Sequence, residues 1–206
     1  MKKKKEAHKL LLTLADSLLT PEGYVRNSQR IVVKENSRFN WSLSFPFRFT
    51  MNTIGFFNII AGIQIPDLNS QFYAEETKFV PHIIVPFHFL DPGRHFKEWQ
   101  FQTEGDLWGL TEDICLAIEQ IDLKFFNPLS TTTKIISQLS KTDPGEWFAI
   151  DPIQRGKLLA CLLFMNGDGK RAVQILDSTL RRFAQLSNHR LQELQVLREK
   201  ISSSST

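Results

Sequence analysis

The chain has 206 residues, the length of one domain or of one domain with an appendage. Seventeen Phe and four Trp indicate an aromatic-rich core, and the otherwise ordinary composition excludes disordered and fibrous proteins. The net charge is +3, but residues 1–9 alone carry +4, so the other 197 residues carry −1. Because a nucleic-acid binder shows a basic surface on its folded body, we expect no nucleic-acid partner.

The N-terminal segment combines lysines with a leucine-rich stretch. Leu10, Leu14 and Leu18 fall on one face of a helix. A signal peptide is the alternative, but Asp16 interrupts the apolar stretch and no small-residue cleavage site follows it. No run reaches the ~18 apolar residues of a membrane span. We therefore expect an amphipathic first helix over residues 4–19, no membrane partner and a cytoplasmic location.

Alternation of apolar and polar residues is strongest between Trp41 and Met51. Successive strand side chains point to opposite faces, so the pattern predicts one long strand with an apolar face and a polar face. Pro46 cannot donate a ladder hydrogen bond, which predicts an edge strand or a bulge at that position. Further strand patterns cover residues 24–34, 57–65, 79–90 and 95–102.

The second half of the chain changes to helical spacing. We expect a helix that begins with Thr111 as its N-cap and ends before Pro128. Further helices are expected over residues 131–139, 152–164, 169–186 and 191–201, with a glycine turn at 166–169 and a disordered tail at 202–205.

Strands followed by helices predict an α+β fold. We expect an N-terminal helix, a four- to five-stranded, mostly antiparallel sheet, and a C-terminal helical region packed on one face. Residues 1–145 would form the sheet domain, and residues 146–206 would add a helical hairpin and an amphipathic helix packed on the same domain. The leucine seam of the last helix also permits pairing between chains, which makes a homodimer through the C-terminal helices an alternative.

Cysteine and histidine positions argue against a cofactor or metal site. Cys115 and Cys161 each lie in an apolar helical run, which favours two reduced, buried thiols, with a disulfide between them as the alternative. His82 and His88 share one strand face, but six residues of strand span roughly 20 Å, whereas zinc–nitrogen bonds are about 2 Å long. His88 and His95 can approach each other across the intervening Asp-Pro-Gly turn. We therefore expect no metal and no cofactor, and keep a histidine cluster as the alternative.

The polar face of the sheet is the surface best placed to meet another protein. Arg48 follows small hydroxyl side chains on this face and can pair with a partner carboxylate. If the strands are neighbours in register, the residues that lie together on it are Ser42, Ser44, Arg48, His82 and His88. The candidate partner-binding residues are Arg48, His82, His88, Arg94 and His95.

Several short segments follow one another in a recognisable order. They are residues 18–24 (Leu-Leu-Thr-Pro-Glu-Gly-Tyr), the alternating strands, Trp108, and residues 125–129 (Phe-Phe-Asn-Pro-Leu). With this order the chain resembles, over residues 10–140, a bacterial family of unknown function that is itself similar to immunity proteins encoded beside polymorphic toxins. The resemblance implies a protein partner and supplies no catalytic residues.

These observations support three functional hypotheses. The first is a non-enzymatic protein-binding module of unknown partner, with a role similar to toxin immunity. The second is a metal-dependent or small-ligand-binding enzyme built around His82, His88, Arg94 and His95. The third is an oligomeric structural protein assembled through its C-terminal helices. The sequence contains no patterned arrangement of Ser, His and Asp for nucleophilic catalysis, which favours the first.

Overall fold

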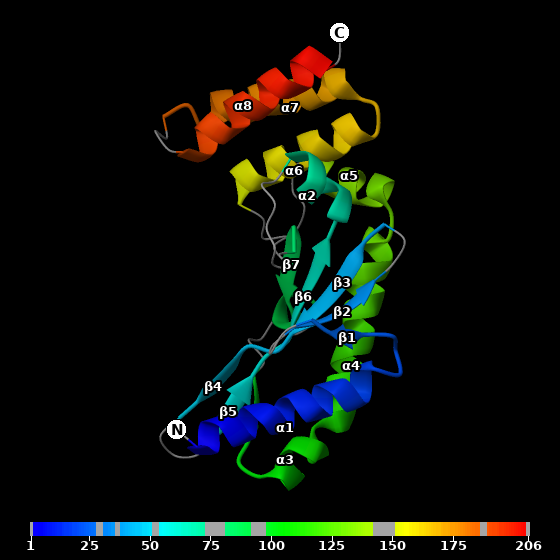
Figure 1. The fold of residues 1–206 in the computed structure, drawn as a ribbon, viewed down its shortest axis with the longest axis vertical. Helices are drawn as coiled ribbons and strands as arrows, with labels where there is room; N and C mark the ends of the chain where they lie inside the picture. Colours follow the sequence, from blue (N-terminus) through cyan, green and yellow to red (C-terminus); the bar gives the residue numbers. More distant parts are fainter. Residues whose placement is uncertain are drawn as a thin grey trace. The chain divides into compact units, whose positions relative to one another are not determined.

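The computed structural model describes residues 2–27, 31–35, 38–50, 54–72, 81–91, 98–141, 151–185 and 189–204 (Figure 1). The fold is α+β with antiparallel strands, as the sequence predicts. Contacts divide the chain into two compact units. The sheet unit comprises residues 1–65 and 78–128, and the helical unit comprises residues 66–77 and 129–206.

The described part of the sheet unit contains two antiparallel sheets and several helices. Its strands are β1 (Val25–Arg26), β2 (Ile31–Glu35), β3 (Asn40–Ser44), β4 (Phe47–Phe49), β5 (Gly55–Phe57), β6 (Ile60–Gln64), β7 (Ile83–Pro86) and β8 (Trp99–Phe101). Its helices are α1 (Lys2–Leu19), η1 (Phe87–Phe89), α3 (Glu104–Gly109), α4 (Thr111–Ile121) and the π-helix η2 (Asp122–Phe126), which η3 (Asn127–Leu129) follows. One sheet has the order β1-β2-β3-β6-β7, and the other has the order β4-β5-β8.

The two sheets share one long hairpin that is interrupted at Pro46. The register of the β3–β6 pair continues into the β4–β5 pair without a shift. Pro46 has no N–H to donate, although its carbonyl accepts a hydrogen bond from the backbone N–H of Asn58 at 3.3 Å. The single strand predicted between Trp41 and Met51 is therefore two strands, β3 and β4, one in each sheet.

Other predicted boundaries are also wrong. The strand predicted over residues 57–65 is divided between β5, which ends at Phe57, and β6, which begins at Ile60. In place of the single strand predicted over residues 24–34, the described residues form β1 and β2, which pair antiparallel with Val25 opposite Val33. The strand predicted over residues 79–90 ends at Pro86, where a 3-10 turn replaces it. Thr111 is the first residue of α4 and does not cap it, because α3 precedes α4 directly.

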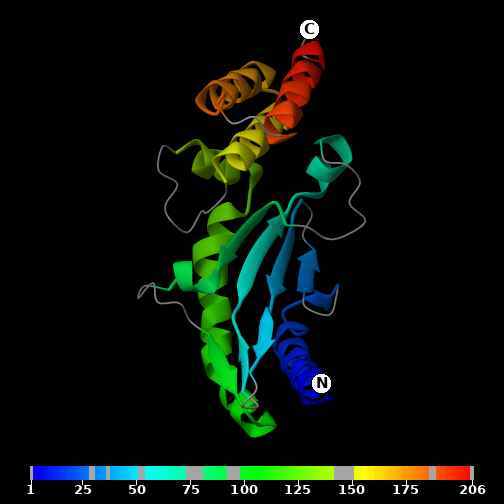
Figure 2. The same ribbon diagram turned by 90° about the vertical axis from the view of Figure 1, so that its left-hand side faces the viewer.

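Helices cover the apolar face of the two sheets. Leu43, Ala61 and Val85 lie opposite one another on three neighbouring strands of this face and are fully buried. Trp41, on the same face, stacks on Phe126 of η2 with ring centroids 4.9 Å apart and planes 7° from parallel. Figure 2 shows α4, which leads into η2, running along the strands of the larger sheet. The apolar alternation thus places the core as predicted.

The opposite face of β3 is not the solvated surface that its polar residues predict. Ser42 is only 2% exposed, and its hydroxyl donates to the carbonyl of Gly62 at 3.3 Å. Pro81 lies so close to Gly62 that a Cβ at this glycine would be 2.8 Å from the proline ring. Positions 42 and 62 carry small side chains because Pro81 fills the space above them.

All regular elements among the described residues of the helical unit are helices. They are α2 (Pro66–Phe72), α5 (Thr132–Ser140), α6 (Pro152–Met165), α7 (Gly169–Arg182) and α8 (His189–Ser204). The predicted hairpin of α6 and α7 is confirmed, and Gly167, with φ +85°, forms its turn. The tail predicted as disordered belongs in part to α8, which extends to Ser204. The contacts group α2 and α5 with these helices, whereas the sequence pattern grouped them with the sheet.

Helix α8 uses its apolar seam inside the helical unit. Leu194, Leu197 and Ile201 are at most 6% exposed, and α8 packs against α6 and α7. The leucine seam that suggested pairing between chains is therefore covered by the same chain. Only Val196 remains as a large apolar side chain exposed on this helix within the described residues.

Helices α6 and α7 of the helical unit approach each other very closely where Gly156 of α6 faces Thr179 of α7. A Cβ at Gly156 would be 2.3 Å from the Thr179 hydroxyl oxygen. We expect Gly156→Ala to lower the free energy of unfolding by about 1–3 kcal/mol, because overpacking outweighs the better helix propensity of Ala. Urea unfolding measures this change. Gly109→Ala is the matched control, since no atom lies within 4 Å of the added Cβ and no comparable loss is expected.

Candidate functional site

Arg48, predicted to meet a partner carboxylate, is already paired within the sheet unit. Its guanidinium donates to both carboxylate oxygens of Glu98, at 3.0 and 2.5 Å. The same guanidinium lies 4.1 Å from the ring centroid of Phe56 on the neighbouring strand. This pairing lowers the pKa of Glu98 through the hydrogen bonds and the positive charge. Arg48 belongs to the smaller sheet, whereas Ser42 and Ser44 belong to the larger one.

His82 and His88 make contacts within the sheet unit. His82 accepts a hydrogen bond at Nδ1 from the backbone N–H of Ile65 at 2.9 Å, next to the end of β6. His88 lies in the 3-10 turn, with its ring centroid 4.3 Å from that of Phe89. Arg94 and His95 lie outside the described residues. Within the described ranges no three His, Cys, Asp or Glu side chains come together in a way that could hold a metal ion.

Cys161 does not have the surroundings of a reactive thiol. Cys161 is fully buried, and burial raises its pKa to about 12. Cys115 is half-buried, and both thiols are free. The expectation that Cys161 is a buried thiol is confirmed, whereas Cys115 is more accessible than predicted.

The outer side of α3, α4 and η2 carries an unusual row of side chains. Three large apolar residues are exposed there, namely Trp108 (43%), Leu116 (51%) and Leu123 (68%). They alternate in the sequence with carboxylates at spacings of three or four residues. Within α4 and its continuation η2 this spacing places Glu112, Leu116 and Glu119 on one side, followed by Leu123, whereas Glu104 and Trp108 belong to the preceding helix α3. We call this row the carboxylate–apolar stripe, and its members are Glu104, Trp108, Glu112, Leu116, Glu119 and Leu123.

The stripe faces outward because the opposite side of α4 supplies the core. Ile114, Ala117 and Ile121 are at most 2% exposed. These residues follow the spacing of a single buried helix face, so the residues between them lie on the outside. The exposed position of Leu116 and Leu123 is therefore fixed by the packing of their neighbours.

Local hydrogen bonds fix the beginning of the stripe. Thr103 caps α3: its side-chain oxygen accepts from the N–H of Asp106, and the Asp106 carboxylate accepts from the N–H of Thr103. These bonds lower the pKa of Asp106, with the backbone N–H groups of Gln102 and Thr103 as the main cause. The indole N–H of Trp108 donates to the carboxylate of Glu104 at 3.3 Å. The stripe thus begins with an aromatic side chain held beside a carboxylate.

Residues 104–123 carry strong negative charge. They contain six carboxylates and neither Lys nor Arg. The first cation that follows is Lys124, whose ammonium group is directed to the carbonyl of Leu90 and the side chain of Gln120, each at 2.7 Å. The stripe can therefore offer apolar contact area between carboxylates, which are complementary to positive charge on a partner.

A buried polar group lies just behind the stripe, at the start of η2. One carboxylate oxygen of Asp122 is buried and has no hydrogen-bond partner within the part of the chain that the structure describes. The nearby hydroxyl of Tyr24 is also buried and has no hydrogen-bond partner among the described residues. Burial raises the pKa of Asp122; Glu22 adds to the rise, and Lys34 opposes it.

We expect Asp122→Asn to change the pH dependence of stability. A raised pKa means that the folded chain favours the protonated carboxyl, so the free energy of unfolding falls as pH rises from the ordinary aspartate pKa through the raised one. The amide removes that decline, so the variant should be more stable than wild type at pH 7 but not at pH 3.5. Urea unfolding at both pH values measures this. Equal effects at the two pH values would contradict the assignment, and Glu119→Gln is the exposed control.

The stripe was not predicted from the sequence. The spacing of the buried residues predicted the helix, and Leu116 and Leu123 received no role. One feature of the sequence could have predicted their exposure. The two leucines are seven residues apart, on the side of the helix where Glu112 and Glu119 indicate a solvent-exposed face.

None of the helices in the described ranges combines the length and the apolar character that crossing a membrane would need. Comparisons with models of protein families, with curated proteins and with solved structures found no match to this chain.

Proposed function

We propose that this chain is a non-enzymatic protein-binding module that recognises a basic protein partner through the carboxylate–apolar stripe. The observation that carries the proposal is the exposure of Trp108, Leu116 and Leu123 in a row between carboxylates. Single exposed apolar side chains are ordinary on a surface, but Leu116 and Leu123 lie seven residues apart on the outer side of α4 and η2 and offer a partner two neighbouring anchors. Large apolar anchors inside a polar rim are the usual arrangement at protein interfaces.

The charge of the stripe determines the kind of partner that it fits. Carboxylates around apolar anchors attract a positively charged surface and repel an acidic one, which adds specificity and speeds association. In a role similar to toxin immunity, the basic partner would be the toxin. The same segment supports that role, because Trp108 and residues 125–129 belong to the resemblance with immunity-like proteins.

Charge reversal on the stripe tests the proposal. The tagged full-length chain is used to purify its partner from the native host, and association rates are then measured with purified components. We expect Glu112→Lys with Glu119→Lys to slow association by about tenfold or more at low salt, with the difference shrinking as salt is raised.

The matched control for this charge reversal is Glu6→Lys with Glu199→Lys. It reverses two exposed carboxylates outside the stripe, one on α1 and one on α8, and so changes the net charge by the same amount. We expect a much smaller change in the association rate from this pair. Equal effects of the two pairs would refute the assignment to the stripe.

A further inference from the structure

Helix α2 is seated on the helical unit by one aromatic side chain and one backbone carbonyl. The ring of Phe72 meets the ring of Phe164 edge-on, with centroids 5.8 Å apart and planes at 84°. The Lys200 ammonium nitrogen lies 5.2 Å from the Phe72 ring centroid and donates to the carbonyl of Gln71 at 2.6 Å. A helix of seven residues is too short to be stable alone, so these contacts hold it in place.

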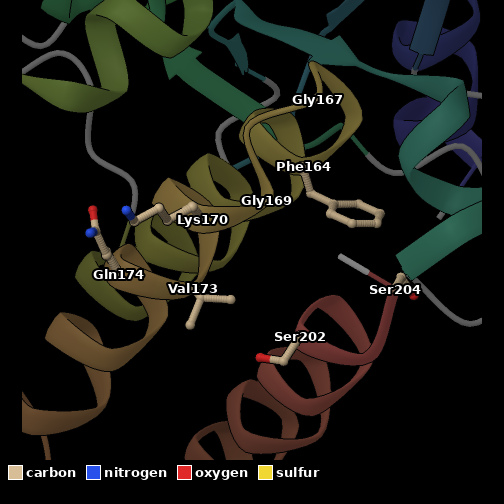
Figure 3. Close-up of a pocket in the computed structure, with 8 residues that line it drawn as sticks. All are labelled: Phe164, Gly167, Gly169, Lys170, Val173, Gln174, Ser202 and Ser204. Atoms are coloured by element: carbon tan, nitrogen blue, oxygen red, sulfur yellow. The ribbon is translucent and has the colours of Figure 1, made fainter. Parts of the chain in front are cut away.

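An open groove of about 750 Å³ begins at Phe164. It lies between the α6–α7 turn and the C-terminal end of α8, and Figure 3 shows Phe164 pointing toward α2 while Val173 faces α8. Its other lining side chains are Lys170, Gln174, Ser202 and Ser204. Because Phe164 both contacts α2 and lines the groove, the groove continues the surface that α2 occupies.

The lining indicates what the groove can bind. Phe164 and Val173 offer apolar contact, and Gln174, Ser202 and Ser204 offer hydrogen-bonding groups suited to a peptide backbone. Among the described residues, Lys170 is the only charged one in the lining, and the lysine beside Phe72 adds a second cation at the α2 end. No carboxylate of the described residues lines the groove, so its charge is complementary to an acidic ligand.

We propose that this groove, together with the adjoining seat of Phe72 on Phe164, binds an acidic peptide segment with an aromatic anchor, and that Phe72 of α2 fills the anchor position in the free chain. Phe72 shows how the anchor is held, between the ring of Phe164 and the ammonium group of Lys200. A peptide that places its own aromatic side chain there would extend past the end of α2 into the open part of the groove. This site belongs to the helical unit and is separate from the carboxylate–apolar stripe.

A peptide with the chain's own sequence is the probe. A fluorescein-labelled peptide of residues 66–77 (PDLNSQFYAEET) carries two aromatic side chains and three carboxylates. Its binding to the full-length chain is measured by fluorescence anisotropy. We expect Phe72→Ala to bind this peptide at least tenfold more tightly than wild type, because the tethered anchor competes at an effective concentration in the millimolar range. Raising the salt concentration should weaken binding.

Two double variants separate groove binding from other effects. Phe72→Ala with Phe164→Ala should lose the peptide, whereas Phe72→Ala with Phe183→Ala, which changes a phenylalanine beyond the end of α7, should keep it. Thermal unfolding verifies that each variant is folded. Equal binding by wild type and Phe72→Ala, or no binding by folded Phe72→Ala at 1 mM, would overturn the proposal. If wild type is a dimer and Phe72→Ala a monomer, the groove holds α2 of a second copy, which also overturns it.

Discussion

Phe126→Ala is expected to lower the free energy of unfolding by about 3–5 kcal/mol, one of the largest single losses in this chain. Phe126 is fully buried and stacks on Trp41 at a centroid distance of 4.9 Å, with Phe125 at 5.3 Å. Its ring thus connects the π-helix η2 to the larger sheet. Truncation leaves a cavity and removes the aromatic pair, which contributes about 0.5–1.5 kcal/mol beyond burial alone. Urea unfolding followed by circular dichroism measures the loss.

Leu123→Ala is the matched control for this substitution. Leu123 lies in the same π-helix but is 68% exposed. We expect its truncation to change the free energy of unfolding by no more than about 0.5 kcal/mol. Comparable losses at the two positions would mean that η2 does not join the core through Phe126.

Leu116→Ala combined with Leu123→Ala is expected to have the largest effect on partner binding. Both side chains protrude from the stripe, and an interface would bury what is now exposed. Loss of this apolar area should weaken binding by about 2–4 kcal/mol, roughly 30- to 1,000-fold in Kd. The free energy of unfolding should hardly change, because neither side chain is in the core. Calorimetric titration with the purified partner measures the change in affinity.

Two exposed valines provide the control for that double variant. Val25 is 71% exposed on β1, and Val196 is 66% exposed on α8. Val25→Ala with Val196→Ala removes apolar surface from residues that are not members of the stripe and should leave Kd within about twofold. If this pair weakens binding as much as the leucine pair, the partner does not recognise the stripe.

The arrangement of strands and helices could be predicted from the sequence where one residue pattern dominates. The alternation that begins at Trp41 placed the core face, and the spacing through Ile114 and Ile121 predicted α4. An irregularity at Pro46 was expected, but the change from one sheet to another was not. A bulge, an edge strand and a change of sheet can each accommodate a residue without a backbone N–H. Which of these occurs depends on the neighbouring strand, where Asn58 supplies the bond that spans the interruption.

The candidate site was harder to predict because its chemistry depends on what each side chain meets. Arg48 has the same sequence surroundings whether it is free or paired, and Glu98 lies fifty residues away. Ser42 appears solvent-facing from alternation alone, yet the approach of Pro81 to Gly62 buries its face of the strand. The stripe was predictable in principle, since Leu116 lies outside the buried helix face, but its exposure follows only from the packing of α4.

The most direct test of the central claim is site-specific photocrosslinking from the stripe. A photoactivatable benzoylphenylalanine is placed at position 116, at position 123, or at position 196 as the control, and the full-length chain is irradiated in its native host. We expect a covalent adduct with one and the same basic protein from positions 116 and 123, and none from position 196. Copurification of the partner with adducts only from position 196, or from none of the three positions, would contradict binding through the stripe.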